Sequence, residues 1–84
     1  MIPPVGIDWG SDVAVPDQIA SMLRAEIAAG KPAKGDTLPS LIELAERFDV
    51  STGTITRALR ILRSEGIIGG RGSRGLVVLR RPKS

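Results

Sequence analysis

The 84-residue sequence is long enough for one domain and too short for two, and its 42% hydrophobic content suits a chain that folds around a small core. It contains no cysteine and no histidine, so we expect no enzyme activity, no bound metal and no cofactor. The formal net charge of +3 hides an asymmetry, because residues 1–50 sum to −4 and residues 51–84 to +7. Seven of the eight cations in the second part are arginines, which bind phosphates and guanine edges well, so a polyanionic partner is favoured.

The first residues of the chain carry no early positive charge and no apolar segment of signal-peptide length, and the longest aliphatic run covers only residues 76–79. We therefore expect neither a signal peptide nor a membrane span, and a cytoplasmic protein. Residues 1–14 mix prolines and glycines without a sustained period, which is typical of a flexible leader. The isolated Trp9 within this leader suggests no function.

A first helix is predicted from Pro16, because apolar residues then recur at spacings of three and four: Ile19, Met22, Leu23 and Ile27. Gly30 supplies a stop signal for this helix. Residues 31–36 contain a proline and a glycine and read as a connection, after which residues 37–38 could form a very short strand.

A second and a third helix follow almost without a gap. Ser40 and Glu43 have the spacing of a capping box, which predicts a helix that ends near Asp49. Ser51 repeats the cap signal and begins a third helix over residues 51–65, whose apolar positions are Ile55, Ala58, Leu59 and Leu62. Two helices about three residues apart indicate a helix-turn-helix.

The pattern changes to that of strands after the third helix. Ile67 and Ile68 begin a β-prone segment, a glycine-rich turn follows, and residues 76–79 form a second strand. The sequence therefore predicts a mainly α fold with a small β-hairpin, a winged helix-turn-helix of three helices plus a wing. We expect this domain to occupy residues 15–79, followed by a basic tail over residues 80–84.

The outer face of the third helix suggests a surface for double-stranded DNA, because small residues at its start would let the backbone approach the bases. Arg57, with Thr52, Thr54 and Thr56, would read bases, whereas Ser51, Arg60, Arg71 and Arg74 would fix the register on the DNA backbone or in the minor groove. The DNA-binding residues expected are Ser51, Thr52, Gly53, Thr54, Thr56, Arg57, Arg60, Arg71, Arg74 and Gly75. Three simpler interpretations remain open: a solvated arginine face, plain capping by Ser51 and an ordinary flexible turn at the wing.

The sequence also resembles the amino-terminal domain of GntR-family transcriptional regulators over about residues 15–79. The similarity lies in residues 17–20, 23–30, 35–40, 43–48, 50–51, 54–55, 57–62 and 65–68, and the Gly-Asp-x-Leu-Pro-Ser element that ends at Ser40 is its most diagnostic part. The resemblance implies operator binding, usually as a dimer on a palindrome, with helix 51–65 in the major groove and wing 69–76 along the minor groove. We therefore expect the protein to repress transcription by occupying a promoter.

The sequence departs from the family at positions where arginine is frequent, since it has Ile42, Thr52 and Thr56 there. Family members usually continue into an effector-binding or dimerisation domain. We expect no small-molecule effector pocket within these residues, and homodimerisation stays open. The alternative function is a winged-helix protein–protein interaction module that binds an acidic partner.

Overall fold

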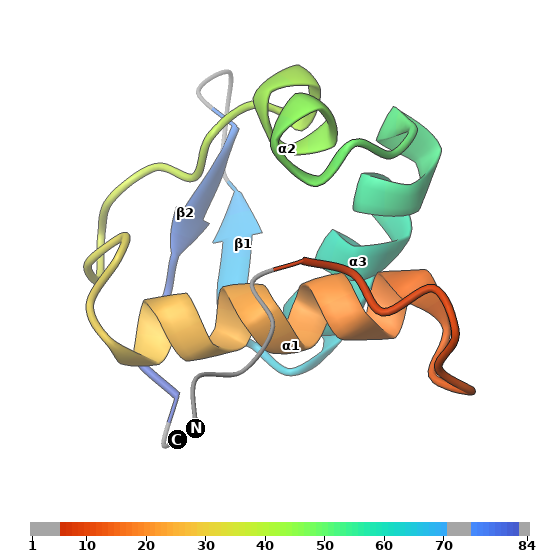
Figure 1. The fold of residues 1–84 in the computed structure, drawn as a ribbon. Helices are drawn as coiled ribbons and strands as arrows, with labels where there is room; N and C mark the ends of the chain where they lie inside the picture. The colour runs from red at the N-terminus through yellow and green to blue at the C-terminus, as the bar shows by residue number, and fades with distance from the viewer. Residues whose placement is uncertain (1–5, 71–74, 83–84) are drawn as a thin grey trace.

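Helix α3 (Thr52–Ser64) is the central element of the computed structural model, which describes residues 6–70 and 75–82. It packs against α1 (Val15–Ala28), α2 (Leu41–Phe48) and strand β1 (Ile68–Gly70). Strand β1 pairs with β2 (Leu76–Val78) in an antiparallel hairpin beside the helices (Figure 1). The chain is therefore a winged helix-turn-helix, as the sequence predicts.

The sheet places the base of the wing next to the start of α2. Ile68 pairs with Val78, and Gly70 pairs with Leu76. The very short strand predicted at residues 37–38 is a single antiparallel bridge between Thr37 and Val77, and the Leu38 amide donates to the Leu76 carbonyl oxygen over 2.9 Å. Because residues 37–38 lead directly into α2, these bonds hold the amino end of α2 beside the hairpin.

Side chains from all three helices and both strands form a single apolar core. The stripe predicted on the third helix is confirmed, because all four of its apolar positions are buried. The large side chains that are almost fully excluded from solvent are Ile19, Ile27, Leu44, Ile55, Leu62, Ile67, Ile68 and Val78. The packing fixes the rotation of α3 about its axis and leaves its polar face toward solvent.

Both predicted serine caps form. The Ser40 hydroxyl accepts from the Glu43 amide over 3.1 Å, while the Glu43 carboxylate accepts from the Ser40 amide over 3.2 Å, which completes the capping box. At the end of α2, Asp49 adopts a left-handed conformation with φ of 56°, and Ser51 then caps α3. This tight turn confirms the predicted helix-turn-helix.

The segments outside the helices and the hairpin also contact the fold. The Gln18 amide group donates to the carbonyl oxygens of Asp8 and Val13, and Ile7 packs against the core, so part of the predicted leader lies along the start of α1. Arg80 and Arg81 of the predicted basic tail donate to backbone carbonyls of the helical layer. No helix within the described ranges is long and apolar enough to cross a membrane.

Candidate nucleic-acid interface

The amino end of α3 is thin and exposed. The Ser51 hydroxyl accepts from the Thr54 amide over 3.2 Å and lies 3.1 Å from the Thr54 hydroxyl. Ser51, Thr52 and Gly53 are exposed, and Gly53 adds no side chain at all. The backbone of this first turn can therefore come close to a flat or grooved partner, with the positive end of the helix dipole pointing outward.

The three threonines of this helix differ in how far their hydroxyls are already used. The Thr56 hydroxyl donates to the Thr52 carbonyl oxygen over 2.9 Å, and the Thr54 hydroxyl contacts Ser51. Within residues 6–70 and 75–82, the Thr52 hydroxyl has no hydrogen-bond partner. Thr52 is therefore the one of the three with its full donor and acceptor capacity left for a ligand.

Three arginines, Arg57, Arg60 and Arg63, extend from the exposed side of α3. In the part of the chain that the structure describes, none of the three has a carboxylate within ion-pair distance. The predicted outward orientation of Arg57 and Arg60 is therefore observed. Three adjacent cations without acid partners form a surface suited to an anionic ligand.

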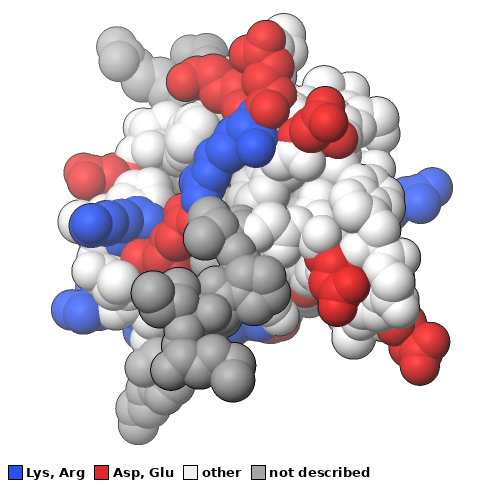
Figure 2. Space-filling model, in the orientation of Figure 1, with Lys and Arg blue, Asp and Glu red and all other residues white. Residues whose placement is uncertain are grey.

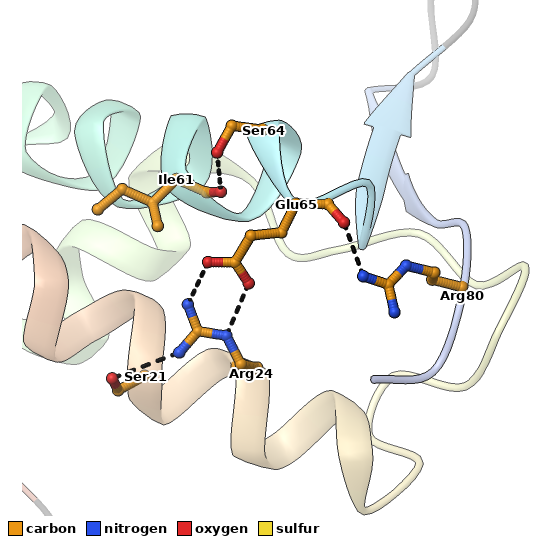
Figure 3. Close-up of polar contacts among 6 residues, drawn as sticks. All are labelled: Ser21, Arg24, Ile61, Ser64, Glu65 and Arg80. Carbon is orange, nitrogen blue, oxygen red and sulfur yellow. Dashed lines mark hydrogen bonds and ion pairs between the residues drawn. The ribbon is translucent and has the colours of Figure 1, made fainter. Parts of the chain in front are cut away.

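Glu65, the acid closest in sequence to these arginines, is held by Arg24 of α1 (Figure 3). The guanidinium binds both carboxylate oxygens, with N–O distances of 2.8 and 2.6 Å. These hydrogen bonds, and the positive charge of Arg24, hold the pKa of Glu65 below its usual range. Glu65 is therefore ionised at neutral pH and turned toward α1.

Residues 1–50, which form the acidic part of the chain, contain one other arginine, Arg47, and it binds Glu26 through both carboxylate oxygens. On the face over α1 and α2, acidic and basic side chains are intermixed (Figure 2). The described residues of that face therefore do not form the continuous positive charge that binding to a polyanion requires. The contrast singles out α3 as the cationic element among the three helices.

A groove of about 710 Å³ runs between α3, the start of α2 and the base of the wing. Of the predicted site residues, Thr56, Arg60 and Gly75 line it together, and Gly75 has a φ of 83° that favours glycine. Arg57 is not among the lining residues, so it lies on a different part of the helix surface. The predicted residues Arg71 and Arg74 lie outside the described residues.

Arg63 also lines this groove, although the sequence-based set of DNA-binding residues did not include it. Its spacing from Thr56 and Arg60, seven and three residues, places all three on one stripe of a helix. That spacing was available in the sequence. What the sequence lacked was the position of the wing base, which determines the side of α3 that borders a groove.

Helices α2 and α3 form a helix-turn-helix, and a β-hairpin follows α3. Together with the exposed arginine face of α3, this arrangement defines a winged helix-turn-helix protein. A family model described as bacterial regulatory proteins, gntR family, matches residues 16–78. The chain therefore belongs to the GntR family.

Two sequence relatives and one solved structure agree with this assignment. The chain is 36% identical over 69 residues to the uncharacterized HTH-type transcriptional regulator YisV of Bacillus subtilis (strain 168), covering 82% of this chain and 14% of that protein. It is 31% identical over 67 residues to the Uxu operon regulator of Haemophilus influenzae, covering 80% of this chain and 25% of that regulator. YtrA from Sulfolobus acidocaldarius, a GntR-family transcription factor, superposes with a TM-score of 0.81 at 36% identity over 90% of this chain and 80% of YtrA. The chain thus spans about a seventh of the length of YisV and about a quarter of the length of the Uxu operon regulator.

Proposed function

We propose that this protein binds double-stranded DNA in a sequence-specific manner and regulates transcription, acting as a repressor by occupying a promoter. The observation that carries the proposal is the outer face of α3, where a thin first turn is followed by three exposed arginines without an acid partner in the described part of the chain. A helix of this shape fits the major groove of a duplex. Membership of a family of regulatory proteins supports binding rather than catalysis.

The positions of individual residues support separate roles for them in this proposal. Thr52 and Arg57 would contact base edges, because Thr52 lies in the exposed first turn and Arg57 projects outside the groove beside the wing. Ser51 and Gly53 would allow close approach, with Thr54 held by the cap. Arg60, and the wing residues Arg71, Arg74 and Gly75, would contact the sugar–phosphate backbone or the minor groove.

Selection of bound sites from a random duplex library tests this proposal. We expect a defined half-site to be enriched, and inverted half-sites about one helical turn apart, roughly 34 Å, would indicate a homodimer. The variant Arg57→Ala should bind the selected site roughly 5- to 150-fold more weakly and lose its preference at one base pair, if its contact there is bidentate. Equal losses on selected and random DNA would exclude Arg57 as a base reader.

A library that yields no enriched sequence, together with weak binding to every duplex, would contradict the proposal. The alternative function, a protein–protein interaction module that binds an acidic partner, would then be favoured. Its difficulty is the shortage of exposed aromatic anchors, since the sequence has one tryptophan, one phenylalanine and no tyrosine, and Phe48 is only 9% exposed.

A further inference from the structure

We propose that Arg63 of α3, together with Arg60, binds a phosphodiester of the DNA strand that runs between α3 and the base of the wing. The inference rests on the proposed function and adds a contact residue and its ligand to it. Arg63 would then contribute affinity that does not depend on the base sequence, because a phosphate contact carries no sequence information by itself.

The first argument is the geometry of the groove. Arg60 and Arg63 lie about one helical turn apart, are both exposed, and both line the groove of about 710 Å³. The base of the wing at Gly75 and Leu76 and the segment that leads into α2 line the same groove. The groove thus presents two guanidinium groups from one side to whatever passes between helix and wing.

The second argument is electrostatic. Two arginines three residues apart on a helix repel one another, and acid neighbours ordinarily relieve this repulsion. Glu65 does not do so, because Arg24 occupies both of its carboxylate oxygens. Glu43 is the acid that lines the same groove, but its carboxylate accepts from the Ser40 amide at the start of α2 and lies beyond ion-pair distance from both arginines. The pair therefore retains a net positive charge that an anion would balance.

The third argument concerns the position of the pair along α3. At a rise of 1.5 Å per residue, Arg60 and Arg63 lie roughly 12 and 17 Å along the axis from Thr52. When the first turn of such a helix enters the major groove, its later turns leave the bases and reach the backbone at the groove edge. A phosphate is therefore the anion that these two side chains would meet.

The test compares three exposed-site variants on the duplex selected above. Arg63→Gln removes one charge from the groove, Arg63→Lys keeps it, and Lys31→Gln removes one from the exposed connection after α1. Binding is measured over a series of salt concentrations on selected and random duplexes. For Arg63→Gln we expect the slope of log K against log salt to fall by about one unit. The fractional loss should be the same on both duplexes, and the other two variants should keep the wild-type slope.

A scan of single neutral methylphosphonate substitutions along the selected duplex locates the contact. We expect at least one position where neutralisation weakens the wild type more than it weakens Arg63→Gln, in which Arg60 alone still contacts the phosphate. A wild-type slope for Arg63→Gln, or a scan in which both proteins respond alike at every position, would overturn the inference while the proposed function stands. Failure of the wild type to bind any duplex would overturn both.

Discussion

The ion pair between Arg24 and Glu65 joins the first helix to the end of the third, and its removal should measurably destabilise the fold. Exposed pairs contribute about 0–1 kcal/mol. The bidentate geometry favours the upper part of this range, whereas side-chain exposures of 32% and 36% argue against a larger value. We therefore expect Glu65→Gln to lower the free energy of unfolding at pH 7 by about 0.5–1 kcal/mol. In this variant the backbone carbonyl oxygen at position 65 would still accept the hydrogen bond from Arg80, because the substitution changes only the side chain.

The same variant has a predictable pH dependence. Hydrogen bonds from Arg24 hold the pKa of Glu65 below its ordinary value in the folded state. A lowered carboxyl pKa contributes stability that is present above the unfolded value, about 4.3, and is lost as the pH falls through the folded value. The difference in stability between the wild type and Glu65→Gln should therefore shrink as the pH is lowered from about 5 through the lowered folded pKa of Glu65.

Urea unfolding followed by circular dichroism at pH 7, 5 and 2.5 measures this difference directly. The matched control is Glu46→Gln, because the exposed Glu46 makes no ion pair with any residue that the structure describes. At pH 7 the loss corresponds to a fall in Tm of roughly 2–8 °C for a domain of this size. A Glu65→Gln deficit that stays the same at all three pH values would refute the assignment of the effect to this ion pair.

Three further variants probe the caps and the core by urea unfolding. Ser40→Ala removes the capping box of a helix only eight residues long and should cost about 0.5–2 kcal/mol, and an unchanged midpoint would show that the cap contributes nothing. Leu62→Ala opens a cavity at a fully buried position and should cost about 2–5 kcal/mol; a loss below 1 kcal/mol would mean that the core closes around the site. Arg81→Met removes the donor to the Ala28 carbonyl at the end of α1 and should cost about 0.3–1 kcal/mol. Its DNA-binding salt slope should match that of the wild type, and a decrease of one unit would instead place Arg81 on a phosphate.

Local signals in the sequence were sufficient for the elements of the fold. Ser40 and Ser51 mark both helix starts correctly because a cap needs only the next three residues. The apolar stripe of α3 also fixes its buried face, since helical geometry alone sets which positions share a side. The orientation of Arg57 and Arg60 toward solvent follows from this same periodicity.

Contacts between residues that are far apart in the sequence could not be predicted from such local signals. The partners of Arg24 and Arg81 lie 41 and 53 residues away in sequence, so no local pattern reveals them. The groove that includes Arg63 depends on the bridge between Thr37 and Val77, which brings the base of the wing beside α2. The division of the α3 arginines between groove and outer face therefore required the tertiary arrangement.

The ion pairs also change what the charge asymmetry of the sequence means. Residues 51–84 contain a single acid, Glu65, and the arginine that binds it comes from the acidic half of the chain. In the described part of the basic half, Arg80 and Arg81 are committed to carbonyls of the α3 and α1 ends. Both keep their positive charge, but among the described residues the arginines that extend from the exposed side of α3 toward a ligand are Arg57, Arg60 and Arg63, and the net charge of +3 understates the local field. It follows that a charge added or removed on α1, far from the groove, should change duplex binding less than the same change on α3, because exposed charges farther apart than about 10 Å are largely screened at 0.1 M salt.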